Sequence, residues 1–312
     1  MKPKVLFIVG PTAVGKTKYA IAAAQAFSGE IISADSMQSY LRMDSGSAKP
    51  TAEDRAQAVH HLVDQIPPEQ SFSVAEYQPL AQSAIQDVLS RGKLPVVSGG
   101  TGLYVNSLIY KMDFGVQGAD ESLRRALEQE AAEKGAEALH ARLREKDPEA
   151  AERIHPNNVQ KIVRALEVLE TTGESIPEFE ESFVKTDDFE PVLFCLDRDR
   201  AQLHQRINKR AELIFEAGLI DEVKGLLAEG LTATNISMKG IGYKEVIAHL
   251  NGEYDEARAL ELVQRNSRRY ARRQLIWFRR NPDMHWVNLS DYATEEDALA
   301  DFLRQVKEAL HG

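Results

Sequence analysis

The amino-acid sequence predicts an α/β protein in which a parallel sheet is flanked by helices and interrupted by an all-helical insertion. Short unbroken apolar runs, such as residues 5–9 and 192–196, are typical of strands buried on both faces of a parallel sheet. Strand, glycine-rich turn and helix follow one another at residues 5–27 and again from residue 94, as in an open α/β sheet. Between residues 119 and 172 the strand signals disappear, and charged, alanine-rich helical segments replace them.

The elements follow in order from these patterns and from helix-capping residues. Strands are expected at residues 5–9, 30–34, 94–98, 191–197 and 285–289. Helices are expected at residues 15–27, 73–91, from 103 onward, 121–134, 159–169, and then within 199–230, 239–250 and 253–278. We therefore predict a core formed by residues 1–114 and 186–312, and a helical insertion domain at residues 115–185.

Composition restricts the class of protein. The chain has 312 residues, about two average domains, and a single cysteine, which excludes a disulfide framework and a cysteine-rich zinc site. No run of 18 apolar residues and no signal-peptide pattern is present, so we expect a cytoplasmic protein without a membrane partner. The net charge of −10 argues against nucleic-acid binding, but residues 262–282 contain seven arginines and no acidic residue.

One motif carries the strongest chemical signal. Its residues are Gly10, Pro11, Thr12, Ala13, Val14, Gly15, Lys16 and Thr17, which fit G-x-x-x-x-G-K-[ST] between a strand and a helix. Backbone N–H groups of such a loop surround phosphate oxygens, and the helix N-terminus adds positive potential. Lys16 supplies a mobile charge for the terminal phosphate, and the Thr17 hydroxyl can hold Mg²⁺. This predicts a P-loop NTPase-like core; the alternative is a chance glycine-rich turn.

The motif does not identify what carries the phosphates. A kinase or NTPase should also have an apolar strand that ends in aspartate to bind Mg²⁺, whereas residues 94–98 end in serine. Two other apolar runs do end in aspartate, at Asp64 and Asp197, so ATP hydrolysis is disfavoured but not excluded. Asp35 follows the second strand, at the edge where parallel strands line a ligand crevice. The alternative for Asp35 is an aspartate that caps a turn.

Several segments together resemble the tRNA dimethylallyltransferases, and they occur in the same order over nearly the whole chain. Besides the P-loop, they are Ile31-Ile32-Ser33-Ala34-Asp35-Ser36-Met37-Gln38, Gly99-Gly100-Thr101, Gln160-Lys161-Ile162-Val163-Arg164-Ala165-Leu166-Glu167, Gly240-Ile241-Gly242-Tyr243 and Arg273-Gln274-Leu275-Ile276-Trp277-Phe278. Eukaryotic members carry a C-terminal zinc finger, and the absence of Cys/His pairs before Gly312 indicates the bacterial type. The sequence leaves the oligomeric state open, and we favour a monomer.

The resemblance implies a P-loop that holds dimethylallyl diphosphate in place of ATP. The five-carbon group then moves to the exocyclic amine of the adenosine 3′ of the tRNA anticodon, with Asp35 as general base. Lys16, Mg²⁺ on Thr17 and an arginine would stabilise the departing diphosphate. We favour Arg210 over Arg206 for that arginine, although either can pair with a glutamate on its own helix. Thr101 is implied to contact the nucleotide, and it can also serve as an N-cap.

The arginines of residues 262–282 form a candidate RNA surface. Arg265, Arg268, Arg269, Arg272 and Arg273 follow helical spacing on one face, which Arg279 and Arg280 extend. A solvated basic stripe is the alternative, but phosphate binding explains a face without acidic residues better. In the glycine-lysine loop, residues 239–244, Tyr243 could stack on a base or serve as a packing anchor. The residues assigned to tRNA are Asp35, Ser36, Met37, Gln38, Thr101, Arg124, Gln160, Lys161, Arg164, Lys239, Gly242, Tyr243, Lys244, Arg272, Arg273 and Gln274.

Two other functions remain open from the sequence. The first is a small-molecule or nucleoside kinase, which would bind ATP tightly but would explain neither the arginine face nor the glycine-lysine loop. The second is a non-catalytic RNA-binding protein in which a bound nucleotide acts as a switch and Asp35 is dispensable.

Overall fold

The computed structural model describes residues 2–47, 49–112, 121–176 and 184–312. These residues form two compact units, one of residues 1–110 with 185–312 and one of residues 111–184. The larger unit is an α/β core, and the smaller one contains only helices among its described residues. No helix among the described residues combines the length and apolar composition needed to cross a bilayer.

A six-stranded parallel sheet forms the centre of the core unit, with the strand order β3-β2-β4-β1-β5-β6. The strands are β1 Lys4–Val9, β2 Gly29–Ser33, β3 His60–His61, β4 Leu94–Gly99, β5 Glu190–Asp197 and β6 His285–Asn288. In the register of the central strands, Leu6 pairs with Val96 on one side and with Val192 on the other. Residues 5–9 are all fully buried, as their unbroken apolar run predicts for a strand covered on both faces.

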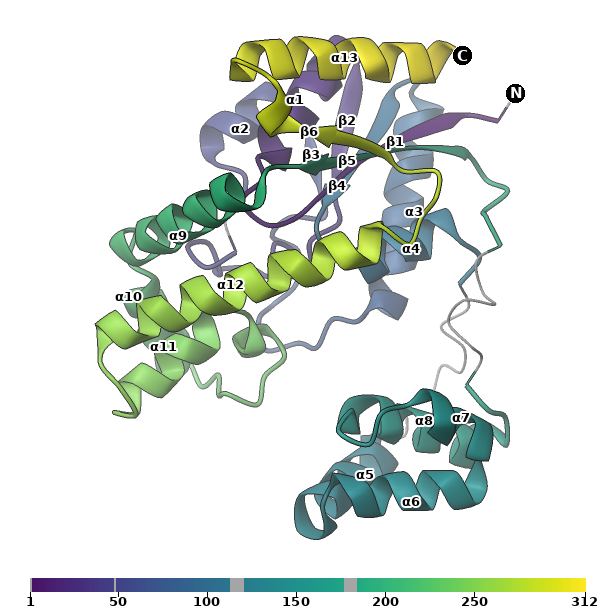
Figure 1. Ribbon diagram of the computed structural model, residues 1–312, viewed down its shortest axis with the longest axis vertical. Helices are drawn as coiled ribbons and strands as arrows, with labels where there is room; N and C mark the ends of the chain where they lie inside the picture. The colour runs from purple at the N-terminus through teal and green to yellow at the C-terminus, as the bar shows by residue number, and fades with distance from the viewer. Residues whose placement is uncertain (1, 48, 113–120, 177–183) are drawn as a thin grey trace. The chain divides into compact units, whose positions relative to one another are not determined.

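Helices cover both faces of this sheet (Figure 1). The helices of the core are α1 Lys16–Ala26, α2 Ala52–Gln57, α3 Val74–Ser90, α4 Gly102–Ile109, α9 Arg200–Glu216, α10 Leu219–Ala228, α11 Tyr243–Leu250, α12 Glu256–Phe278 and α13 Glu295–His311, with short 3₁₀ turns at Ser237–Lys239 and Leu289–Asp291. α1 and α13 share one hydrophobic core with the sheet, in which Tyr19 and Phe194 both pack edge-on against Phe302. α9 and α12 pack against each other.

Two glycines explain why the predicted boundaries of two helices are wrong. The segment predicted as helical over residues 199–230 is divided into α9 and α10, because Gly218 adopts φ 93° and ends the regular backbone. The helix predicted from residue 239 begins only at Tyr243, because Gly242 adopts φ 103°. In the core unit, α2, β3 and α13 are additional to the sequence prediction.

The helical unit consists of α5 Glu121–Lys134, α6 Ala136–Lys146, α7 Pro148–Arg153 and α8 Val159–Thr172. Its own core contains Leu127, Leu139, Leu143, Ile162 and Leu166, so it does not depend on the sheet for burial of its apolar side chains. Asn158 caps α8 by accepting a hydrogen bond from the backbone N–H of Lys161. Residues 115–120, the first part of the predicted insertion, lie outside the described residues.

Candidate active site

The P-loop connects β1 to α1 and places backbone N–H groups at the start of that helix. Its first residue, Gly10, has φ 148°, and a Cβ there would lie 2.5 Å from the Leu196 carbonyl oxygen, so only glycine fits. No acidic residue occupies the first turn of α1, so nothing there offsets the positive end of the helix dipole. The loop therefore has the geometry and the potential of an anion site.

Lys16 points over this loop. Its ammonium donates hydrogen bonds to the carbonyl oxygens of Gly10 at 3.0 Å and Pro11 at 2.8 Å. Burial lowers the pKa of Lys16 to about 8, although the Asp35 carboxylate opposes the shift by raising the pKa. An anion on the loop would favour the charged lysine in the same way.

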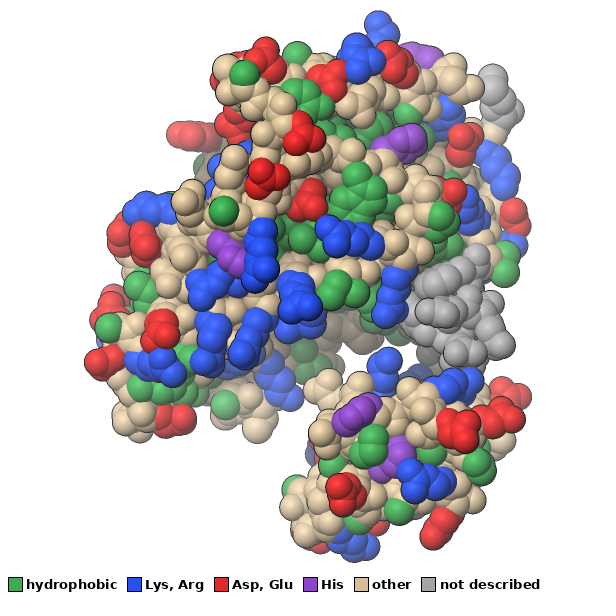
Figure 2. All heavy atoms as spheres, viewed as in Figure 1, with side chains coloured by type: hydrophobic (Ala, Val, Ile, Leu, Met, Phe, Trp, Pro, Cys, Tyr) green, Lys and Arg blue, Asp and Glu red, His purple; other side chains and the backbone are tan. Residues whose placement is uncertain are grey.

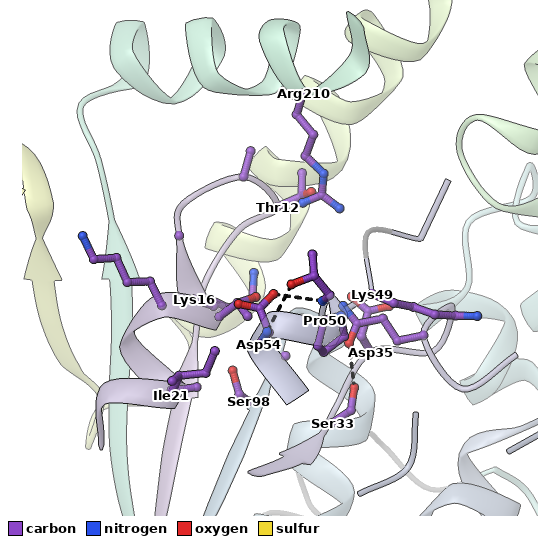
Figure 3. Close-up of a pocket in the computed structure, with 18 of the residues that line it drawn as sticks. Thr12, Lys16, Ile21, Ser33, Asp35, Lys49, Pro50, Asp54, Ser98 and Arg210 are labelled. Atoms are coloured by element: carbon purple, nitrogen blue, oxygen red, sulfur yellow. Dashed lines mark hydrogen bonds between the residues drawn. The ribbon is translucent and has the colours of Figure 1, made fainter. Parts of the chain in front are cut away.

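Two arginines of α9 lie near the P-loop and line the same cavity as Lys16. The Nε of Arg206 donates a hydrogen bond to the carbonyl oxygen of Ala13 at 2.9 Å, and the Arg206 side chain is exposed. Arg210 is half-buried and reaches from α9 toward Thr12 (Figure 3). Burial lowers the pKa of Arg210, and Asp35 raises it. Arg210 is thus the α9 arginine that acts electrostatically on Asp35, whereas Arg206 holds the loop backbone.

Asp35 lies directly after β2 and lines the cavity beside Lys16 (Figure 3). Its Oδ1 accepts a hydrogen bond from the backbone N–H of Met37 at 3.0 Å, which fixes the carboxylate at the start of the loop. Thr101 follows β4, the neighbouring strand. Its Oγ1 accepts from the backbone N–H of Ser36 at 3.1 Å and donates to Ser36 Oγ at 3.4 Å. Thr101 stands at the N-cap of α4 without a side-chain cap bond, so its hydroxyl connects the two strand ends instead.

Tyr270 of α12 belongs to the site, although it was not among the residues predicted from the sequence. Its side chain lines both cavities of this region and hydrogen-bonds to the side chains of Thr101 and Gln274. Burial raises the pKa of Tyr270 to about 12, so the phenol remains neutral at neutral pH. Tyr270 lies four residues before Gln274 and therefore on the same side of α12, and this spacing could have identified it from the sequence.

Gln274 has a different position from the predicted tRNA contact. Its side chain is buried, with 6% exposed, and its amide joins two turns of the site. Oε1 accepts from the backbone N–H of Thr12 at 2.9 Å, and Nε2 donates to the carbonyl oxygen of Gly100 at 2.8 Å. A Cβ at Gly100 would lie 2.3 Å from this nitrogen. Gln274 therefore supports the P-loop from α12, and its amide is not available to RNA in this geometry.

Two cavities meet at Asp35. The larger, about 1060 Å³, contains the P-loop residues Gly15, Lys16 and Thr17. The smaller, about 320 Å³, is lined by residues predicted to bind tRNA: Ser36, Met37, Lys239, Lys244 and Arg273. The walls common to both include Thr12, Asp35, Arg210 and Tyr270. An anion held on the P-loop and a base entering from the smaller cavity would thus meet beside the Asp35 carboxylate.

The glycine-lysine loop contributes its lysines to this second cavity but not its tyrosine. Lys239 and Lys244 are exposed, whereas Tyr243 is fully buried, with 0% exposed, and donates a hydrogen bond to Glu222 Oε1 at 2.7 Å. The predicted base-stacking role of Tyr243 is therefore wrong, and the packing role is correct. Gly242 is also buried, and its backbone N–H donates to Glu245 Oε2 at 2.7 Å.

The arginines of α12 cover one face of the core (Figure 2). Of the predicted stripe, Arg269, Arg272 and Arg273 on α12 are exposed, as are Arg279 and Arg280 directly after the helix. Arg265 and Arg268 are half-buried, and Arg268 donates a hydrogen bond to Asn208 Oδ1 on α9, so these two depart from the predicted stripe. Packing of α9 against α12 covers this end of the stripe in part.

In the helical unit, the predicted tRNA residues lie on α5 and α8. Gln160 and Lys161 are exposed in the first turn of α8. Arg124 and Arg164 both donate hydrogen bonds to Glu167, at 2.8 and 3.0 Å.

No group of three or more His, Cys, Asp or Glu side chains that could hold a metal occurs among the described residues. Thr17 is exposed and lines the larger cavity, where its hydroxyl is a hard oxygen donor. Asp64, one of the two aspartates that follow an apolar run, instead accepts hydrogen bonds from Lys49 and Arg55. Asp197 accepts from the backbone N–H of Arg198 at 2.8 Å.

Comparison with known proteins identifies relatives along the whole chain. A family model described as IPP transferase matches residues 38–281. The chain is 48% identical over 307 residues to a tRNA dimethylallyltransferase of Alkaliphilus oremlandii, with 98% of each chain covered. It is similar to the crystal structure of a tRNA isopentenylpyrophosphate transferase from Bacillus halodurans, with 41% identity, a TM-score of 0.75, and 99% of this chain and 97% of that chain covered. A eukaryotic dimethylallyltransferase acting on tRNA gives 26% identity and a TM-score of 0.81, with 98% of this chain and 80% of that chain covered.

Proposed function

The chain belongs to the IPP transferase family of tRNA dimethylallyltransferases, and from this premise we propose how its residues perform the transfer. The substrates are dimethylallyl diphosphate and a tRNA whose adenosine 3′ of the anticodon presents its exocyclic N6 amine. The observation that supports this assignment most directly is the position of Asp35. It lies where a cavity that contains the P-loop meets a cavity bordered by two lysines and two arginines.

The diphosphate binds to the P-loop backbone, with Lys16 and Arg210 as its cations. For this, the Lys16 ammonium leaves the carbonyl oxygens of its own loop, which it contacts in the free protein, and turns to the phosphate. Arg206 holds the carbonyl oxygen of Ala13 and so fixes the loop, whose Ala13 has a left-handed backbone with φ 64°. Cations preorganised around the leaving group stabilise the charge that builds on it as the C–O bond breaks.

In the transfer step, the adenosine N6 forms a bond to C1 of the dimethylallyl group while the bond from C1 to the diphosphate oxygen breaks. The diphosphate leaves with the bonding electron pair, and the amine loses a proton to Asp35. General-base assistance of this kind contributes about 10²- to 10⁴-fold. The Met37 amide holds the carboxylate, and the Thr101 hydroxyl is close enough to the Asp35 loop to orient the base.

Mg²⁺ fits this site as a partner of the diphosphate rather than as an ion in a protein cage. The hydroxyl of Thr17, which lines the larger cavity, would be a protein ligand, and Mg²⁺ usually combines one or two protein ligands with phosphate oxygens and water. When bound, the ion would neutralise charge on the departing diphosphate.

For tRNA, we propose two surfaces. The exposed arginines of α12, with Lys239 and Lys244, contact phosphates near the active site, and the helical unit contacts the anticodon stem-loop through α5 and α8. We expect a cytoplasmic monomer.

The test is transfer of label from radioactive dimethylallyl diphosphate to unmodified tRNA, followed by nucleoside analysis by mass spectrometry. The expected product is N6-dimethylallyladenosine, which should appear with dimethylallyl diphosphate and not with ATP. A kinase would instead be stabilised against thermal unfolding by ATP and would transfer phosphate. Binding of tRNA without any transfer would favour the nucleotide-switch alternative.

A further inference from the structure

A carboxylate in the helical unit is buried beside the two arginines of that unit that we assign to tRNA. The Glu167 side chain is 1% exposed, although the other buried side chains of α8 are apolar. Its Oε2 accepts from Arg124 Nη2 at 2.8 Å, across from α5, and from Arg164 Nη1 at 3.0 Å, within α8. Its Oε1 is buried and has no hydrogen-bond partner among the described residues.

A contribution to folding stability does not by itself account for this buried carboxylate. Burying a charge is unfavourable unless the group is fully paired, and a buried ion pair is often no more stable than apolar residues of the same size. Glu167 satisfies only one of its oxygens, in a unit whose core already contains Leu127, Leu139 and Leu166. A role in fixing its two partners explains the carboxylate better than a role in holding the fold.

Both partners remain accessible. The side chains of Arg124 and Arg164 are 41% and 39% exposed, although each donates to the buried carboxylate. A shared anion also offsets the repulsion between two neighbouring guanidinium groups, and it reduces the side-chain freedom that each arginine would lose on binding RNA. Planar guanidinium groups held in this way are suited to phosphate oxygens.

We propose that Glu167 is a positioning residue for tRNA binding, which holds Arg124 and Arg164 in the orientation that contacts the RNA backbone. This inference rests on the proposed function, because it presupposes that the helical unit binds tRNA.

The first experiment measures tRNA affinity of the full-length Glu167→Gln variant as a function of salt. Loss of a negative charge near RNA should by itself strengthen binding, whereas loss of positioning should weaken it by about tenfold. The two explanations therefore predict opposite signs. Affinity for dimethylallyl diphosphate should be unchanged. Glu167→Asp keeps the charge but moves it away from the arginines by the length of one methylene, so it should also weaken tRNA binding. This second variant tests the inference if Glu167→Gln folds poorly.

Glu170 offers a matched control on the same helix. It accepts from Arg142 at 2.7 Å and Lys146 at 2.8 Å, two residues that we do not assign to tRNA. Glu170→Gln should leave tRNA affinity within about twofold of the wild type. In a background of Arg124→Ala and Arg164→Ala, Glu167→Gln should have no further effect on binding, because it acts through these arginines.

Unchanged or tighter tRNA binding by both Glu167 variants would overturn the inference, as would an additive loss in the arginine-free background. A wild-type protein that neither binds nor modifies tRNA would instead overturn the proposed function, so the two failures are distinguishable.

Discussion

Replacing Gln274 by methionine tests whether this side chain supports the P-loop or contacts tRNA. Methionine has nearly the same length but cannot form the bonds to the Thr12 N–H and the Gly100 carbonyl oxygen. The Gly100 bond is buried, so an unpaired carbonyl there costs about 1–3 kcal/mol; the Thr12 bond is partly exposed, and its loss costs about 0.5–1.5 kcal/mol. Together these costs of about 1.5–4.5 kcal/mol correspond to a melting temperature lowered by roughly 3–18 °C for a unit of this size.

The kinetic effect of Gln274→Met should appear in the KM for dimethylallyl diphosphate rather than in the affinity for tRNA. Thr12 belongs to the loop that binds the diphosphate, so we expect a raised KM for dimethylallyl diphosphate and a tRNA affinity close to that of the wild type. Thermal unfolding by circular dichroism and steady-state kinetics with each substrate varied in turn measure these effects. Gln264→Met is the control, because Gln264 lies on the same helix and donates one long bond of 3.4 Å to the Asn208 carbonyl oxygen. Normal stability and diphosphate KM combined with weakened tRNA binding would refute the support role.

Three further outcomes follow from the site. Asp35→Asn should lower kcat by about 10²- to 10⁴-fold with near-normal binding of both substrates. Asp54→Asn, which alters another carboxylate of the larger cavity, should leave kcat unchanged. A loss of tRNA affinity as large as the loss of rate would show that Asp35 acts in recognition. The pKa of Lys16 is lowered to about 8, so its side chain is charged below that pH and loses its charge above it. Affinity for the diphosphate should therefore fall as the pH rises through 8, and Lys16→Arg should remove this dependence. Calorimetry at a series of pH values measures both. Replacing Arg272 and Arg273 by alanine should lower the slope of log tRNA affinity against log salt by about 0.7–0.9 per lost contact, and an unchanged slope in a folded variant would show a merely solvated stripe.

Much of the core was predictable because its signals are local. The P-loop, the strand before it and the helix after it are specified by adjacent residues, and the buried apolar runs of the central strands allow little else. The two-residue strand β3 is too short to show a period. The terminal helix α13 carries a capping threonine, Thr294, and the buried Phe302 and Val306 at helical spacing, so its signal was present and overlooked.

The errors concern side chains whose environment depends on distant residues. Tyr243 and Gln274 have the polar groups expected of RNA contacts, but Glu222 and the P-loop, which lie far away in the sequence, bury them. Arg268 similarly donates a hydrogen bond to Asn208 of α9. Residue type and spacing define which side of a helix a residue occupies, whereas only the packing of the neighbouring elements decides whether that side meets solvent.

α12 carries two kinds of residue in one uninterrupted helix of 23 residues: Tyr270 and Gln274 toward the P-loop, Arg272 and Arg273 toward solvent. An α-helix turns by about 100° per residue, so one residue inserted or deleted between Tyr270 and Gln274 would rotate one of these two side chains away from the P-loop. Substitutions at Arg272 and Arg273 leave the P-loop contacts of Gln274 in place, whereas a change in the number of residues in this stretch would not. Engineering of tRNA preference on this helix should therefore exchange side chains and leave its length alone.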